Sequence, residues 1–320
     1  MPSSQNLYIR FLEQAAAHPG RKALLFESNT WRYADVNRLI RSQAARLRTA
    51  GLKPGGRAAI LLKNSPAYLF NLFAIWACGA AAVPINHFLK AAEVDFILKD
   101  SSAALLITDS EFREVADSLT APARKFPIDE LSDEERVFSP ETRNDANELA
   151  LIIYTSGTTG RPKGACLTHG NLIANVESCE DALGVKSRTD RILIILPMFH
   201  SFMMTVGMLT PLLTGFGIVL VTSLKPFSNV IKEMIRKRVT ILPAIPQVYQ
   251  AFANAHIPWY VRWRLPLRLA ISGAAPLPAE TLERFNRKFK IKLLEGYGLS
   301  EASPVVTFNP LHGAQKPGSC

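Results

Sequence analysis

The chain has 320 residues, of which 48% are hydrophobic, so it can bury the core of two domains or of one large domain. Its 18 glycines and 21 prolines exclude a low-complexity or disordered chain. The four cysteines form no C-x-x-C pair and no metal-ligand spacing with histidine, and no secretory signal is visible at the start, so we expect a cytoplasmic protein with reduced thiols.

The net charge of +10 is concentrated in one part of the chain. Residues 225–292 contain 13 Arg or Lys and 3 Glu, a difference equal to the whole excess. Such charge runs are usually solvated faces of helices. The same patch would also attract polyanions, including nucleotides, the phosphates of coenzyme A or an anionic membrane surface.

In chain order, helical and strand patterns alternate almost throughout. The first part predicts helices at residues 34–50, 65–78, 91–100 and 111–119, and strands at residues 57–62, 81–84 and 104–108. Ser65 and Pro66 are typical of a helix start, as N-cap and first-turn residue. Residues 122–148, with Pro127, Pro140 and an acidic cluster, break the alternation and predict a surface excursion.

The alternation then resumes. We expect strands at residues 149–155, 192–196, 217–221, 239–242, 267–272 and 291–294, and helices at residues 171–183, 203–213, 229–237, 247–255 and 279–289. Two apolar stretches, residues 68–85 and 192–221, are interrupted by polar residues and prolines, so we interpret them as buried helix–strand pairs and not as membrane spans. The alternation predicts an α/β fold with mostly parallel sheets and helices on both faces.

A glycine- and hydroxyl-rich segment, Tyr154-Thr-Ser-Gly-Thr-Thr-Gly-Arg-Pro-Lys-Gly164, follows the apolar run of residues 149–153. Its candidate ligand-binding residues are Thr155, Ser156, Gly157, Thr158, Thr159, Gly160 and Lys163. Glycines let backbone N–H groups turn towards an anion, hydroxyls add donors, and lysine adds a positive charge. The Walker A spacing is absent. The segment therefore predicts a phosphate-binding loop of another kind.

A second segment, residues 295–301, follows the predicted strand at residues 291–294. Two glycines flank Tyr297, whose ring can lie against a flat base. Ser300 can donate a hydrogen bond to a phosphate oxygen, and Glu301 can bind Mg²⁺ through a carboxylate oxygen. This segment is informative because it is paired with the glycine-rich loop.

Two more segments follow predicted strands, at the edge of the sheet where α/β folds bind ligands. Residues 197–200 end in His200, for which a catalytic role and a structural role are equally supported. Residues 272–276 are small and permit a ligand to approach the backbone closely.

Together these segments resemble the adenylate-forming superfamily of acyl-CoA synthetases, peptide-synthetase adenylation domains and luciferases. The strings LPMFHSFMMTVGMLTPLLTGFGIVL, ISGAAPLP and LEGYGLSEASPVV most resemble the long-chain fatty acid–CoA ligases. The resemblance implies an α/β fold of two doubly wound sheets with flanking helices, in α/β/α/β/α layers. It also implies a first subdomain at residues 1–185 and a second at residues 186–320, on which the extreme N-terminus can pack.

The resemblance implies a two-step reaction that uses ATP, Mg²⁺ and coenzyme A. The carboxylate of a medium- or long-chain fatty acid attacks the α-phosphorus of ATP and releases pyrophosphate. The thiolate of coenzyme A then attacks the carbonyl of the acyl-adenylate. Because the first step joins two anions, the charge on the phosphates must be neutralised.

The family's residue roles can be assigned to matching positions. The residues matching Thr155 to Lys163 bind the β- and γ-phosphates, and the catalytic residues are counted as Lys163, His200, Ser300 and Glu301. Ser300 contacts the region of the α-phosphate, Glu301 binds the metal, and His200 lies near the carboxylate and the acyl tunnel. The matching nucleotide-binding positions further along the chain are Gly273, Ala274, Ala275, Glu295, Gly296, Tyr297, Gly298 and Ser300.

The chain departs from the family pattern in two ways. Ser300 stands where most members have Thr, which keeps the hydroxyl. Family members also continue beyond the string that starts at Lys316, through a β-barrel subdomain to a mobile C-terminal lid that carries a lysine for adenylation. We therefore expect this chain to be the large-domain portion of such an enzyme, which binds ATP but is impaired in turnover.

Two alternatives stay open. The acyl acceptor can be the thiol of a carrier protein instead of coenzyme A. In another class, the chain is a non-catalytic module for membranes or nucleic acid, because Trp259-Tyr-Val-Arg-Trp-Arg264 interleaves aromatic residues with arginines. The same segment also suits a helix packed on the sheet with snorkelling arginines.

We favour the enzyme without a specific nucleic-acid partner, because a basic patch does not account for a phosphate loop and a metal-binding carboxylate. A peripheral position at the inner face of a membrane is compatible with it. The acyl chain length and the oligomeric state, a dimer included, are not fixed by the sequence.

Overall fold

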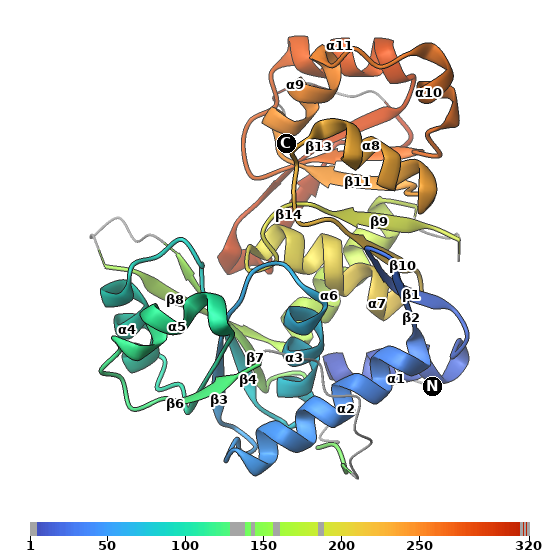
Figure 1. The fold of residues 1–320 in the computed structure, drawn as a ribbon. Helices are drawn as coiled ribbons and strands as arrows, with labels where there is room; N and C mark the ends of the chain where they lie inside the picture. The colour runs from blue at the N-terminus through green and yellow to red at the C-terminus, as the bar shows by residue number, and fades with distance from the viewer. Residues whose placement is uncertain are drawn as a thin grey trace. The chain divides into compact units, whose positions relative to one another are not determined.

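A computed structural model describes residues 5–128, 138–141, 145–155, 161–184, 189–313, 316 and 318. The chain folds into two compact units (Figure 1). Unit 1 consists of Met1–Gly20, Trp31–Ala174 and Met198–His200, and unit 2 consists of Arg21–Thr30, Asn175–Pro197 and Ser201–Cys320. There are two α/β sheets with flanking helices, which confirms the fold class predicted from the sequence.

Unit 1 is built on a six-stranded sheet in the order β6-β5-β3-β4-β7-β8, in which only β7 and β8 pair in antiparallel fashion. The strands are β3 (Arg57–Leu61), β4 (Ala81–Pro84), β5 (Leu105–Thr108), β6 (Arg124–Pro127), β7 (Leu149–Thr155) and β8 (Lys163–Thr168). The helices are α1 (Leu7–Ala17), α2 (Tyr33–Thr49), α3 (Pro66–Ala77), α4 (Ala91–Asp100), η1 (Ser110–Phe112), α5 (Arg113–Asp117) and the start of α6 (His169–Ala182).

Helix α3 explains one of the two apolar stretches. Its N-cap Ser65 accepts a hydrogen bond from the backbone N–H of Tyr68 at 3.2 Å, as predicted. Every residue of the helix except Ala67 is buried, so α3 is apolar because it is covered on all sides. The indole N–H of Trp76 donates to the carbonyl of Ala150 in β7 at 2.8 Å. Within the described ranges, no helix is long and apolar enough to cross a bilayer.

The sequence patterns do not predict two strands of unit 1, β6 and β8. Strand β6 pairs with β5 inside the region expected to be a surface excursion. Strand β8 pairs with β7 between the glycine-rich loop and the next helix. Most residues of both strands are exposed or half-buried, so neither forms the buried apolar run that identifies a strand in sequence.

Unit 2 is built on an eight-stranded sheet in the order β14-β13-β12-β11-β9-β10-β1-β2. The strands are β1 (Lys22–Phe26), β2 (Asn29–Arg32), β9 (Arg191–Ile194), β10 (Gly217–Leu220), β11 (Ile241–Ala244), β12 (Leu269–Ser272), β13 (Lys292–Gly298) and β14 (Val305–Phe308). The pairs from β1 to β13 run parallel, and β14 closes the edge antiparallel to β13. Strand β1 joins this sheet beside β10 although it comes from the start of the chain.

The helices predicted at residues 203–213, 229–237, 247–255 and 279–289 are present in unit 2, together with η3 (Ser300–Ala302), which was not predicted, and α10 (Trp259–Arg264), which the sequence left open. The predicted elements are η2 (Met203–Leu209), α7 (Thr210–Thr214), α8 (Phe227–Arg236), α9 (Pro246–Asn254) and α11 (Ala279–Phe289). The element η2 is a π-helix that is buried throughout, and Thr210 Oγ1 donates to the carbonyl of Thr205 at 2.9 Å. A Cβ at Gly207 would lie 2.3 Å from the sulfur of Met203, so glycine makes room for this side chain in the core.

Tyr249 joins α9 to the sheet of unit 2. Its buried hydroxyl donates to the carbonyl of Leu242 in β11 at 2.5 Å and accepts from the N–H of Ile271 in β12 at 3.0 Å. Burial raises the pKa of this phenol well above its usual value, so it stays a neutral donor. The loops at the carboxyl ends of β11 and β12 therefore start from a fixed position.

Candidate functional site

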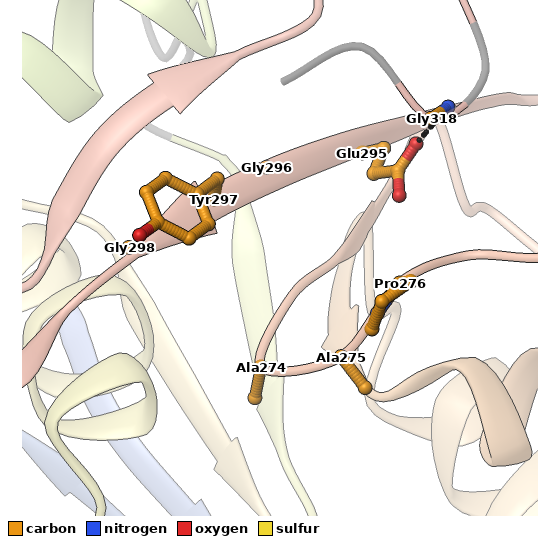
Figure 2. Close-up of a pocket in the computed structure, with 8 residues that line it drawn as sticks. All are labelled: Ala274, Ala275, Pro276, Glu295, Gly296, Tyr297, Gly298 and Gly318. Atoms are coloured by element: carbon orange, nitrogen blue, oxygen red, sulfur yellow. Dashed lines mark hydrogen bonds between the residues drawn. The ribbon is translucent and has the colours of Figure 1, made fainter.

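A pocket of about 310 Å³ opens at the carboxyl ends of β12 and β13 in unit 2 (Figure 2). Its lining residues come from the loop after β12, from β13 and from the end of the described chain: Ala274, Ala275, Pro276, Glu295, Gly296, Tyr297, Gly298 and Gly318. Ala274 has a φ of 65°, in the left-handed region where a small side chain is least disfavoured. The walls are therefore mostly backbone and small side chains, with one aromatic ring.

That ring belongs to Tyr297, which is 47% exposed. The glycines on either side of it permit the close pairing of β13 with β14. A Cβ at Gly296 would lie 2.4 Å from the ring of Phe308, and one at Gly298 would lie 2.3 Å from the carbonyl oxygen of Pro304. The register shifts between Tyr297 and Gly298. The local backbone thus holds an aromatic face open to a flat ligand.

Glu295 holds the two ends of the pocket wall together. Its side chain is buried, Oε1 accepts from the N–H of Leu277 at 2.8 Å, and Oε2 accepts from the N–H of Gly318 at 3.0 Å. Figure 2 shows the carboxylate turned towards Gly318. The sequence grouped Glu295 with the nucleotide-binding residues. In the structure both of its oxygens bind backbone N–H groups, so it shapes the pocket.

Gly273, also predicted at this site, lies beside the core of unit 2. A Cβ at this position would come within 3.1 Å of the ring of Phe202. The absence of a side chain therefore lets the loop after β12 lie against this ring.

Ser300 and Glu301 lie in η3, directly after β13. The hydroxyl of Ser300 is 3.1 Å from that of Ser201. Thr205 Oγ1 in η2 donates to the carbonyl of Ser303, just after η3, at 3.1 Å, so Ser201 and Thr205 together contact both ends of this segment. The sequence did not identify Ser201 and Thr205, although Ser201 directly follows His200 at the end of residues 197–200.

Asn175 in α6 is a second residue that the sequence did not identify. Its amide donates to the carbonyl of Val305 at 2.7 Å and accepts from the N–H of the same residue at 3.2 Å. This two-way bond fixes the start of β14 behind η3. The sequence does not indicate this role of Asn175, because Val305, to which it bonds, is far away in the sequence.

Glu301 is exposed at the surface of unit 2. Among the described residues, no group of three or more His, Cys, Asp or Glu could hold a metal ion. A single exposed carboxylate fits Mg²⁺ that is held mainly by phosphate oxygens and water, because Mg²⁺ commonly takes only one or two protein carboxylates. It does not fit a structural metal centre.

The two ends of the glycine-rich segment lie in the antiparallel pair of strands β7 and β8 in unit 1. Thr155 at the end of β7 pairs with Lys163 at the start of β8, so these two predicted residues are brought together. Ser156, Gly157, Thr158, Thr159 and Gly160 lie outside the described residues. Lys163 is exposed.

The last glycine of this segment has a packing role. A Cβ at Gly164 would lie 2.7 Å from Cγ2 of Ile152 and 3.2 Å from the ring of Tyr154. The hydroxyl of Tyr154 in turn donates to Asp100 at 2.5 Å. Glycine therefore lets β8 pair closely with β7 where Gly164 lies opposite Tyr154.

His200 lies in unit 1, at the end of a segment that is held by Asn64. The side-chain oxygen of Asn64 accepts from the N–H of Met198 at 2.7 Å. The ring of Phe199 lies edge-on to that of His87, with 5.3 Å between centroids. Although part of His200 is exposed, surrounding atoms desolvate its ring and lower its pKa, which favours the neutral imidazole.

Comparisons with known proteins identify the family. The family model described as "AMP-binding enzyme" matches residues 11–320. A feruloyl-CoA synthase from Amycolatopsis sp is 36% identical over 96% of this chain and 62% of its own length. A long-chain-fatty-acid–CoA ligase from Bacillus subtilis is 29% identical over the same shares. The crystal structure of ATP-bound MatB from Rhodopseudomonas palustris superimposes with a TM-score of 0.87 at 25% identity, over 98% of this chain and 63% of that one.

The chain spans about 62% of the length of these curated relatives. The family match extends over both units and includes every candidate residue described above. On this evidence the chain belongs to the AMP-binding enzyme family.

Proposed function

We propose that this chain binds ATP and is the large-domain portion of an enzyme that activates a carboxylate as its acyl-adenylate, with a thioester of coenzyme A as the final product. The observation that supports the proposal most is the pocket around Tyr297, which is followed immediately in the chain by Ser300 and Glu301. An aromatic face, backbone polar groups, a hydroxyl and a carboxylate in this order suit an adenine base, a phosphate and a divalent cation. Relatives whose names are CoA ligases support the acceptor.

In the proposed first step, a carboxylate oxygen forms a bond to the α-phosphorus of ATP and the bond to the β-phosphate oxygen breaks, so pyrophosphate leaves. In the second, the thiolate of coenzyme A bonds to the acyl carbon and AMP leaves. Mg²⁺, when bound, would supply positive charge to the phosphates, and Glu301 would hold it through a carboxylate oxygen. Lys163 and the hydroxyls of the glycine-rich loop would bind the β- and γ-phosphates.

His200 is proposed to lie beside the substrate carboxylate. The lowered pKa supports this role, because a neutral imidazole can donate or accept one hydrogen bond without holding the nucleophile as a fixed ion pair. Ser300 would donate to the α-phosphate region, and its hydroxyl is already oriented by Ser201.

We propose a fatty acid of medium or long chain as the carboxylate. The resemblance of residues 196–220 to fatty acid–CoA ligases supports it, as does the relative from B. subtilis. A long acyl chain also partitions into membranes, which suits a peripheral position. The name of the Amycolatopsis relative favours an aromatic carboxylate as the second candidate.

Carboxylate-dependent release of pyrophosphate from ATP tests the proposal. The whole protein should release pyrophosphate with palmitate faster than with ferulate, and the reverse order would select the second candidate. Supplying either coenzyme A or a phosphopantetheinylated carrier protein would identify the acceptor. No release with any carboxylate, together with no ATP binding by calorimetry, would falsify the proposal.

Lys163→Met tests the role assigned to the glycine-rich loop. Replacing a lysine that contacts phosphates should raise the KM for ATP by about tenfold or more, because a charge-assisted hydrogen bond is lost. Lys53→Met, at another exposed lysine of unit 1, is the matched control and should leave the KM unchanged. Equal effects of the two substitutions would remove Lys163 from the site.

A further inference from the structure

Helix α10 gathers three exposed aromatic side chains within six residues. Trp259, Tyr260 and Trp263 are 73%, 52% and 82% exposed, and no residue of the helix is buried. The segment is therefore a helix, as one interpretation of the sequence expected, but its aromatic side chains are not packed on the sheet. Clustered exposed aromatic rings on a folded domain usually mark a contact surface.

The geometry of α10 keeps these rings pointing outward. Successive residues are about 100° apart around a helix, so Trp259, Trp263 and Tyr260 share one side within an arc of about 100°. A neighbouring side is anchored, because Arg262 Nη1 donates to the carbonyl of Lys288 at the end of α11 at 3.0 Å. Ile257 and Leu265, which flank the helix, are buried. We call the outward side the aromatic face of α10.

The end of α9, just before α10, is also fixed. Lys288 Nζ donates to the carbonyls of Phe252 at 3.0 Å and Ala253 at 3.1 Å. A lysine at the C-terminus of a helix satisfies its last carbonyls and complements its dipole. Because Lys288 and Arg262 link α9, α10 and α11, the aromatic face has a fixed position in unit 2.

The surroundings of the aromatic face are basic. From residue 234 to residue 279 the sequence contains six Arg or Lys and no Asp or Glu, although Arg236 and Lys237 pair with Glu233, and Arg268 pairs with Asp190. Arg264 is exposed and follows Tyr260 by one helical turn, next to the aromatic face. Arg287 and Lys290 are exposed on α11 and beside it. This charge complements an anionic surface and repels a second copy of the same face.

We propose that the aromatic face of α10 docks unit 2 on an anionic lipid bilayer. Trp and Tyr favour the headgroup level of a membrane, where the ring is buried and its polar atom stays hydrated. Neighbouring Arg and Lys bind the anionic headgroups. A nucleic acid fits less well, because Arg262 is turned inward to Lys288 and cannot contact phosphates on the side that carries the rings.

Vesicle binding tests the proposal without ATP or a carboxylate, so its outcome is independent of the proposed enzyme activity. The 320-residue chain should sediment with vesicles of phosphatidylcholine and phosphatidylglycerol, and less with phosphatidylcholine alone. Two of its four tryptophans lie in α10, so the emission should shift to shorter wavelength on binding. Trp259→Ser with Trp263→Ser should weaken binding roughly tenfold or more and abolish the shift. Arg264→Gln should weaken binding only to the anionic vesicles.

Matched controls separate docking from general stickiness. Phe88→Ser removes an aromatic ring of unit 1 that is 73% exposed, and Arg113→Gln removes an exposed arginine of the same unit. Neither should change vesicle binding, and far-ultraviolet circular dichroism should show all variants folded. Unchanged binding of the double tryptophan variant would overturn the proposal. Two other results would also overturn it. One is that the chain does not bind vesicles but binds an oligonucleotide in a way that requires Arg264. The other is that it does not bind vesicles but forms dimers, seen by sedimentation, that are lost when the two tryptophans are replaced.

Discussion

At the scale of single residues, Tyr297 is the side chain of the pocket that can distinguish a flat base from other ligands. Stacking of a base on an aromatic ring contributes about 1–3 kcal/mol. Tyr297→Ala should therefore weaken ATP binding about 5- to 100-fold by calorimetry, and Tyr297→Phe should bind almost as well as the wild type. Tyr260→Ala, at the similarly exposed tyrosine of α10, should leave the affinity unchanged. Equal losses for the Ala and Phe variants would mean that the hydroxyl, and not the ring, binds the nucleotide.

His169 is the residue that should couple folding to pH. It is buried at the start of α6, its Nδ1 accepts from the N–H of Leu7 at 3.2 Å, and burial lowers its pKa from 6.5 to about 4. On acidification the unfolded chain binds its proton near pH 6.5, whereas the folded chain binds it only near pH 4. The contribution of His169 to stability is thus complete above about pH 6.5 and is lost progressively as the pH falls towards 4.

Denaturant titrations at several pH values measure this coupling. One pKa unit corresponds to about 1.4 kcal/mol, so His169 should lower the free energy of unfolding by about 3 kcal/mol between pH 7 and pH 4. Because carboxylates also change the free energy of unfolding in this pH range, the effect of His169 is measured as the difference between the wild type and variants. His169→Gln should flatten the profile by that amount, whereas His256→Gln, at an exposed histidine, should leave its slope as in the wild type. Parallel profiles for wild type and His169→Gln would contradict the assignment.

At the scale of elements, the pairing of β13 with β14 positions the whole candidate site of unit 2. Gly298→Ala would place a Cβ 2.3 Å from the carbonyl oxygen of Pro304, and backbone cannot swing aside as a flexible side chain can. We expect a loss of roughly 1–3 kcal/mol in the free energy of unfolding and weaker ATP binding, because Tyr297 and Ser300 lie next to the displaced strand. Thermal unfolding and calorimetry on the same sample measure both.

Gly20→Ala is the matched control for this substitution. Its Cβ would have only Arg32 Nη1 nearby, at an ordinary contact distance of 3.8 Å, so stability should change by less than about 0.5 kcal/mol. If Gly298→Ala is as well tolerated as Gly20→Ala, the close approach of β13 and β14 does not constrain the site.

At the scale of the whole molecule, each of the two compact units has its own sheet and its own buried residues. Such units commonly unfold in separate transitions. A variant that keeps only Trp76 reports on unit 1 by fluorescence, and one whose single tryptophan replaces the half-buried Phe289 of α11 reports on unit 2. We expect the two probes to give different midpoints in urea. Coincident midpoints would mean that the chain unfolds as one cooperative body.

An ion pair of unit 2 sharpens this test. Buried Asp190 accepts from Arg268 Nε at 2.8 Å and Nη2 at 2.5 Å, and from the hydroxyl of Thr240 at 2.7 Å. Asp190→Asn should cost about 2–4 kcal/mol, because the arginine keeps its charge and loses its partner. The loss should appear in the transition of unit 2, reported by the Phe289→Trp probe, and leave the Trp76 transition unchanged.

Glu280→Gln is the control, because the exposed pair of Glu280 with Arg284 at 3.3 Å should contribute less than about 0.5 kcal/mol. A shift of both transitions by Asp190→Asn would show that the two units are energetically coupled.

The sequence by itself determined the class of fold and the order of most elements. Buried parallel strands such as β3 and β11 read as short apolar runs, and capping residues such as Ser65 place helix starts, because both signals depend on neighbouring residues alone. The glycine-rich loop and the segment around Tyr297 are likewise recognised by their local composition, so the resemblance to the family is visible in the sequence alone.

Only the tertiary structure decided which of these residues line the pocket and which bond to the backbone around it. Strands β1 and β8 are defined by the strands with which they pair. The partner of β1 is β10, whose residue Ile218 lies opposite Leu24 although the two are far apart in the sequence. Glu295 is structural because the N–H groups that it binds belong to distant parts of the chain. The exposure of α10 was also undetermined by sequence, since an amphipathic pattern does not say which of its faces has a partner in the fold.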